Sequence, residues 1–121
     1  MFTLDTNILI YYAAGEEKVV SFLSQHQNET FYLPTIVATE FLSYPLIEDE
    51  TIGLFRIFLT QTIPIGLDLG LAEQAALVRR AYKLKTVDAI IAATAILTKS
   101  SLITRNIIDF KKIKELNIIE L

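Results

Sequence analysis

Short apolar segments alternate with longer helical segments along this chain of 121 residues, and no other feature constrains its fold as strongly. The strand-like segments are residues 1–4, 30–34, 62–67, 101–104 and 117–121. The helix-like segments are residues 6–15, 16–27, 35–44, 49–61, 68–84 and 86–99, and residues 106–115 form a short helix or a turn. Strands that alternate with helices in this way indicate a layered α/β fold with a mainly parallel sheet.

Residues at the segment boundaries predict where individual elements begin and end. Thr6 is the predicted N-cap of the first helix and Gly15 its stop, while Thr35 and Asp68 are the predicted N-caps of two later helices. The proline in segment 62–67 predicts that this strand lies at an edge of the sheet.

The composition excludes several kinds of site. The chain has no cysteine and one histidine, which rules out disulfides, thiolate metal sites and paired imidazoles. No uncharged apolar run approaches the ~18 residues of a membrane-spanning helix, and no signal peptide is evident. The lack of cysteine fits a reducing setting, so we expect a cytoplasmic protein. Because 52% of the residues are apolar, we also expect part of the surface to meet a partner or a second copy of the chain.

The charged residues are distributed unevenly between the two parts of the sequence. Residues 1–78 contain two basic and ten acidic side chains, whereas residues 79–121 contain nine basic and four acidic ones. Such a division can mark a side that faces a polyanion, although chance and solvated helix faces explain it equally well.

Two aspartates stand out because their surroundings are apolar. Asp5 ends the first strand, and ligands of parallel sheets bind beyond the carboxyl ends of the strands. Asp88 lies in the first turn of helix 86–99, on the same side as Ile91 and Ala92. Each has a purely structural alternative, since Asp5 could cap the next helix and Asp88 could complement its helix dipole.

Three further polar residues accompany these aspartates. Glu40 is predicted to lie on the buried face of helix 35–44, because Val37 and Tyr44 are among its helical neighbours. A glutamate in such a position needs a partner. Asn106 and Asp109 follow strand 101–104, and Asp109 could simply bond locally.

Convergence of Asp5, Glu40 and Asp88 would imply a bound cation. Two like charges ~4 Å apart repel by roughly 4 kcal/mol at an effective dielectric constant near 20. A hard divalent cation relieves this repulsion, and it can activate water and stabilise a phosphoryl transition state. The residues alone therefore indicate a metal-dependent phosphoryl or nucleic-acid hydrolase.

The motifs LDTNILI, TIVATEFL, VDAIIAATA and LITRNIIDF, in this order and at this spacing, resemble those of PIN-domain nucleases, especially the small toxins of VapC type. The resemblance covers residues 1–121 as one PIN-like domain. It implies an α/β/α sandwich around a five-stranded parallel sheet. It also implies an acidic pocket that binds Mg²⁺ or Mn²⁺ and hydrolyses RNA.

The resemblance also assigns roles to individual residues. Asp5, Glu40 and Asp88 correspond to the three core acids, with Asp5 and Asp88 anchoring the metal and Glu40 activating water. Asn106 stands where many relatives have a fourth acid, which Asp109 could partly replace. The resemblance gives supporting roles to Thr6, Asn7 and Thr104, which hold the acids in place. Three basic residues lie next to acidic motifs and could hold flanking phosphates, although ordinary surface charge explains them equally well: Arg105, Lys85 and Lys83.

Relatives usually form dimers and are silenced by a cognate antitoxin, so we expect a homodimer and an antitoxin partner that use the apolar helices 6–15 and 49–61.

Three alternatives remain at this stage. They are a housekeeping PIN-domain nuclease that processes RNA, a catalytically weak PIN-like binding module, and a phosphoacceptor receiver domain. The receiver domain is disfavoured because LDTN contains one acid and FYLP ends without one.

Overall fold

One sheet of five strands organises the computed structural model, which describes residues 1–121. The strands are β1 (Phe2–Leu4), β2 (Phe31–Pro34), β3 (Ile63–Ile65), β4 (Ser101–Thr104) and β5 (Ile118–Glu120). Their order is β3-β2-β1-β4-β5, and every neighbouring pair is parallel. The predicted five-stranded parallel sheet is confirmed, and β3 lies at its edge as its proline indicated.

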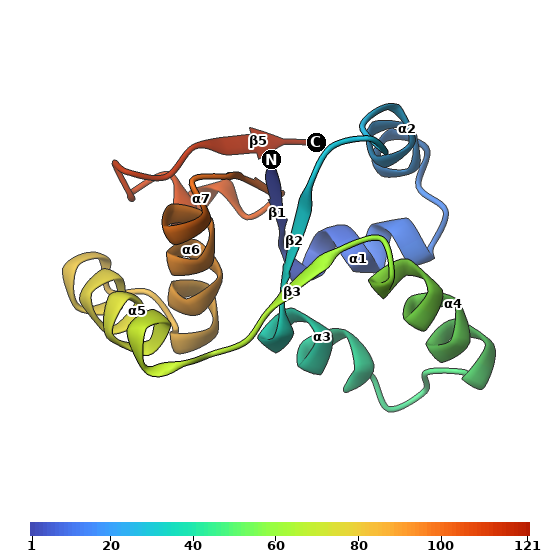
Figure 1. The fold of residues 1–121 in the computed structure, drawn as a ribbon, viewed down its shortest axis with the longest axis horizontal. Coiled ribbons are helices and arrows are strands. Elements are labelled where there is room, and N and C mark those ends of the chain that lie inside the picture. Colours follow the sequence, from blue (N-terminus) through green and yellow to red (C-terminus); the bar gives the residue numbers. More distant parts are fainter.

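Seven helices complete the predicted three-layer α/β/α sandwich. They are α1 (Thr6–Ala13), α2 (Glu17–Gln25), α3 (Thr35–Leu42), α4 (Asp49–Leu59), α5 (Leu69–Tyr82), α6 (Thr86–Thr98) and α7 (Ile107–Phe110). Figure 1 shows α5 and α6 on one side of β1 and β2, and α1, α2 and α4 on the other. None of these helices combines the length and apolar character needed to cross a membrane.

The centre of the core lies where α6 packs on the sheet. All seven residues from 89 to 95 in α6 are buried, and four of them are alanine. Their small side chains let α6 contact β1, β2 and β4 together. The middle strand β1 is buried along its whole length, so Asp5, which follows it, lies next to the interior.

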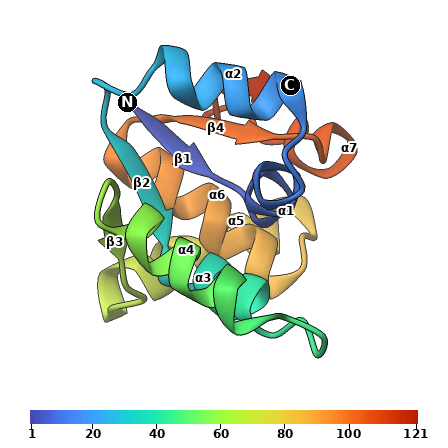
Figure 2. The ribbon, with the colours of Figure 1, turned by 90° about the vertical axis from the view of Figure 1, so that its right-hand side faces the viewer.

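The path of the chain makes the ends of β1 and β4 the natural place for a site. From β1 the chain proceeds to β2 and β3 on one side, and then returns to β4 and β5 on the other. In Figure 2, β1 and β4 run side by side in the same direction. Ligands of α/β folds bind where the strand order reverses in this way. Leu4 pairs with Ile103, so the next residues along the two strands, Asp5 and Thr104, lie side by side.

Two of the predicted helix caps were wrong, whereas Asp68 caps α5 as predicted. Asp5 rather than Thr6 is the N-cap of α1, because the strand ends at residue 4 and the helix begins directly after the aspartate. Pro34 rather than Thr35 is the N-cap of α3, and no side chain caps this helix. Segment 106–115, predicted as a short helix or a turn, is helical over α7 and continues in turns beyond Lys111.

Lys99 provides a test of the backbone geometry, because it ends α6 in the left-handed conformation with φ 54°. We predict that Lys99→Gly raises the free energy of unfolding by roughly 0.5–1 kcal/mol, since glycine adopts this conformation without steric cost. Urea denaturation followed by circular dichroism measures the effect. The matched control is Lys111→Gly, at a right-handed position, which should lower stability. An equal decrease for both variants would contradict the prediction.

Candidate functional site

Asp5 lies at the centre of the site and is only 5% exposed. Its Oδ1 accepts a hydrogen bond from the Thr6 backbone N–H at 2.7 Å. Its Oδ2 accepts hydrogen bonds from the Thr104 hydroxyl at 2.6 Å and from the Asn7 amide at 3.3 Å. The Thr104 oxygen also accepts the Asn106 backbone N–H at 2.9 Å. These bonds hold the carboxylate in one orientation, and no cationic group is among its partners.

Glu40 does not lie on the buried face that the sequence predicted for it. The residues that α3 buries are Val37 and Phe41, whereas Glu40 is exposed. The helix also ends before Tyr44, so this predicted apolar neighbour is 58% exposed. Glu40 instead approaches the site from the solvent side, where its Oε1 accepts a hydrogen bond from the Thr6 hydroxyl at 2.5 Å.

Asp88 lies in the first turn of α6 as predicted, and it is half-buried. Burial is the main cause that raises the pKa of its carboxyl, and the charges of Asp109 and Glu40 raise this pKa further. Lys85, the N-cap residue of α6, acts in the opposite direction.

The pKa of Asp5 responds to the same group of acids. Burial raises this pKa from 3.8 to about 6, against the hydrogen bonds from Thr104 and Thr6, which lower it. The charges of Asp88 and Glu40 contribute further to the rise. The fold therefore gathers the three predicted acids into one electrostatically coupled group, although they come from three different elements.

The chemistry of this group fits a hard divalent cation. None of Asp5, Glu40 and Asp88 forms an ion pair with a lysine or arginine. No three acidic or histidine side chains lie close enough together to hold an ion by themselves. Mg²⁺ commonly binds through one or two carboxylates and completes its coordination with water and phosphate oxygens, so the donors present suit it.

Asn106 and Asp109 form a pair next to the three acids. The Asn106 side-chain amide donates a hydrogen bond to Asp109 Oδ2 at 3.1 Å. Asp109 also lies 4.0 Å from the Lys112 ammonium, in a contact where both side chains are more than 40% exposed. Since Asp109 raises the pKa of Asp88, its carboxylate belongs to the same coupled group.

The three basic residues predicted to hold phosphates have different surroundings. Arg105 pairs with Glu16 and lies over the Tyr11 ring, 4.1 Å from its centroid. Glu16 and Tyr11 were missed in the sequence, because 89 residues separate Glu16 from Arg105 and neither belongs to a recognisable motif. Lys85 and Lys83 are both exposed at the turn between α5 and α6.

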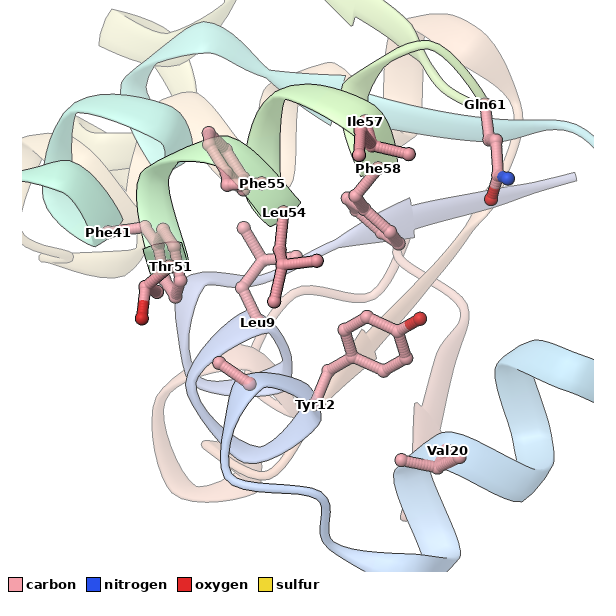
Figure 3. Close-up of a pocket in the computed structure, with 11 residues that line it drawn as sticks. Leu9, Tyr12, Val20, Phe41, Thr51, Leu54, Phe55, Ile57, Phe58 and Gln61 are labelled. Carbon is pink, nitrogen blue, oxygen red and sulfur yellow. The ribbon is translucent and has the colours of Figure 1, made fainter. Parts of the chain in front are cut away.

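A separate apolar groove lies between α1 and α4 and has a volume of about 400 Å³. Figure 3 shows Leu9 and Tyr12 of α1 facing Leu54 and Phe58 of α4 across this groove. Beside it, between α1 and the segment from α3 to α4, lies a second hollow of about 580 Å³ whose lining includes Glu40. The two hollows share residues, so they form one apolar surface that reaches the edge of the acidic site.

Comparison with known proteins places the fold in a defined group. A family model described as the PIN domain matches residues 2–116 of the sequence. No curated protein matches the chain.

Several solved structures match over nearly the whole length. A chain of a toxin–antitoxin complex from Klebsiella pneumoniae is 30% identical, with a TM-score of 0.84 over 98% of this chain and 96% of that one. A chain of VapBC2 from Rickettsia felis, bound to a DNA fragment from its promoter, is 22% identical with a TM-score of 0.86 over 99% and 98%. A chain of DNA-bound VapBC from Salmonella typhimurium is 18% identical with a TM-score of 0.85 over 98% and 96%. The last two similarities concern the fold alone.

The raised pKa of Asp5 predicts a pH dependence of stability in the metal-free protein. The folded state retains the Asp5 proton up to about pH 6, whereas the unfolded state loses it near pH 4. The stabilisation from the neutral carboxyl is therefore complete below pH 4 and is lost as the pH rises through 6.

We expect Asp5→Asn to gain stability relative to the parent as the pH rises from 4 to 7, by up to roughly 3 kcal/mol. Urea denaturation in a chelator, at several pH values, measures this difference. Subtraction of the two proteins removes the contribution of the titrating groups that do not interact with Asp5. A difference that stays constant over this pH range would show that burial does not perturb Asp5.

Proposed function

This chain belongs to the PIN-domain family of nucleases, and from that premise we propose that it is a metal-dependent endoribonuclease that hydrolyses RNA phosphodiester bonds. The observation that carries the proposal is the coupling of Asp5, Glu40 and Asp88, none of which forms an ion pair with a lysine or arginine. We further propose that it acts in the cytoplasm as the toxin of a toxin–antitoxin pair. The support for this role is the 30% identity to a chain of the Klebsiella pneumoniae toxin–antitoxin complex.

The proposed cofactor is Mg²⁺ or Mn²⁺, held by Asp5 and Asp88 directly or through water. When bound, such an ion polarises the phosphate and promotes ionisation of a water molecule. The hydrogen bonds from Thr104, Asn7 and the Thr6 backbone would keep Asp5 oriented toward the ion. Supporting contacts of this kind commonly determine how well a ligand holds its metal.

Glu40 is the proposed group that orients and deprotonates the attacking water. Its exposed position suits this role, because one carboxylate oxygen is held by the Thr6 hydroxyl while the side chain faces solvent. The proposed base therefore has access to water and a fixed orientation, as general-base catalysis requires. Thr6 links the two acids, since its N–H bonds to Asp5 and its hydroxyl bonds to Glu40.

Asp109 is the proposed fourth carboxylate, one helical turn beyond the position that Asn106 occupies. The Asn106 amide holds Asp109 by a hydrogen bond, and the charge of Asp109 raises the pKa of Asp88. Lys85, exposed at the start of α6, is the proposed contact for a flanking phosphate of the RNA. Arg105 is less suited to that role, because Glu16 already pairs with its guanidinium.

The apolar surface beside α1 and α4 is the proposed contact for the antitoxin, and further exposed apolar residues support homodimer formation. Large apolar side chains such as Ile10, Leu46, Leu54 and Ile57 are more than half exposed there. A groove of this kind accommodates the apolar face of an amphipathic helix. Contacts next to Glu40 would also place the partner beside the catalytic acids.

Loss of either metal-binding aspartate should remove RNA cleavage. We predict that Asp5→Asn and Asp88→Asn each reduce the cleavage rate of single-stranded RNA in Mg²⁺ or Mn²⁺ by at least ~100-fold. A chelator should abolish cleavage by the parent. Asp68→Asn makes the same chemical change at the cap of α5 and should retain activity, since asparagine also caps helices. Parental activity in both site variants would disprove the assignment.

The groove makes a separate prediction about the partner. Ile57→Glu should weaken binding of the proposed cognate antitoxin by at least ~10-fold, because it places a charge on an apolar contact surface. Its RNA cleavage should equal that of the parent. Leu97→Glu is the control, since Leu97 is similarly exposed but lies at the far end of α6. Calorimetric titration with the purified antitoxin distinguishes the variants, and equal affinities would exclude this groove.

A further inference from the structure

Arg105 is a cation within the loop of the acidic site that does not neutralise the acids. It lies between Thr104 and Asn106, and its backbone N–H donates to Asn7 Oδ1 at 3.4 Å. Its guanidinium forms no ion pair with Asp5, Glu40 or Asp88. Other contacts hold the side chain.

Glu16 and Tyr11 provide those contacts. The Arg105 guanidinium forms two hydrogen bonds with the Glu16 carboxylate, one of them 2.7 Å long. It also lies over the Tyr11 ring at 4.1 Å from the centroid, a favourable geometry for a cation. The pair is partly shielded, with 26% of the Arg105 side chain and 33% of the Glu16 side chain exposed. Two parallel hydrogen bonds to one carboxylate fix the direction of a guanidinium as well as its position.

The turn between α1 and α2 presents Glu16 for this contact. Gly15 adopts φ 76°, and the Glu16 backbone N–H donates to the Tyr11 carbonyl at 3.0 Å. Glu16 is the N-cap residue of α2, yet its carboxylate accepts no hydrogen bond from that helix. The backbone is thus anchored locally while the carboxylate is committed to Arg105.

Without Glu16, the acids would be the strongest alternative partners for this guanidinium. Arg105 Nε is buried with no hydrogen-bond partner, so the present position satisfies the side chain incompletely. A guanidinium is drawn to carboxylates with which it can form paired hydrogen bonds. Bound to them, it would compete with a divalent cation for the same oxygens.

We propose that Glu16 is a positioning residue that holds the Arg105 guanidinium away from the carboxylates, and so keeps the acidic site accessible to a divalent cation. This inference rests on the proposed function, because it treats Asp5 and Asp88 as cation ligands. It adds a role for a residue outside the acidic motifs, 89 residues away from Arg105 in the chain.

The experiment is a calorimetric titration of the full chain with Mn²⁺ alone, without RNA. The proteins are the parent, Glu16→Gln, Arg105→Gln and the double variant, with Glu17→Gln as matched control. Glu17 is the adjacent exposed glutamate, so its variant makes the same change in net charge. It forms no ion pair, so its variant removes no contact to Arg105. Thermal unfolding verifies that each protein is folded.

We expect Glu16→Gln to raise the Kd for Mn²⁺ by at least ~10-fold, in the range of other residues that support metal ligands. Glu17→Gln and Arg105→Gln should bind no more weakly than the parent, and the double variant should recover parental affinity. Glu16→Asp, which keeps the charge but reaches less far, should give an intermediate value.

Parental affinity in Glu16→Gln would overturn the inference. So would a double variant as weak as Glu16→Gln, because Glu16 would then act on the site without Arg105. Failure of the parent to bind Mn²⁺ would overturn the proposed function and this inference together, whereas the other two outcomes leave the proposed function intact.

Discussion

Burial of one carboxylate at the end of the central strand is the constraint on which the rest of the site depends. Asp5 follows a strand that is buried along its whole length, so its side chain is almost withdrawn from water. Three hydrogen bonds offset only part of the cost of burying this charge, and the pKa of Asp5 still rises to about 6. A buried carboxylate with further acids nearby is a costly arrangement unless a cation joins it.

The fold maintains this costly arrangement through contacts between distant segments. The parallel register of β1 and β4 puts Thr104 beside Asp5, and the start of α1 links Asp5 to Glu40 through Thr6. Alanines in α6 allow close packing on the sheet, which brings Asp88 to the same end of the molecule. The interior thus provides a rigid support, and the electrostatic strain is confined to the site, as is common where function opposes stability.

The sequence predicted the fold class and the main elements because strand and helix periodicities were distinct along the chain. Asp5 directly follows a strand and Asp88 lies in the first turn of a helix, as the sequence predicted. Glu40 was assigned to the wrong face, because α3 is too short for helical spacing to decide between its buried side and its rim.

The contact between Glu16 and Arg105 could not be predicted from local patterns. It depends on a turn after α1 and on a loop after β4, which meet only in the folded chain. The contact between Asn106 and Asp109 is easier to predict, since the two residues are three positions apart in the sequence. The proximity of Asp109 to Asp88 depends on tertiary structure.

The most direct test of the central claim is the anomalous scattering of Mn²⁺ in a crystal of the wild-type chain. The acidic site predicts an anomalous peak in contact with a carboxylate oxygen of Asp5 or Asp88, with water completing the coordination. A crystal equilibrated with Mn²⁺ that shows no peak among Asp5, Glu40 and Asp88 would contradict the claim that these acids form a cation site.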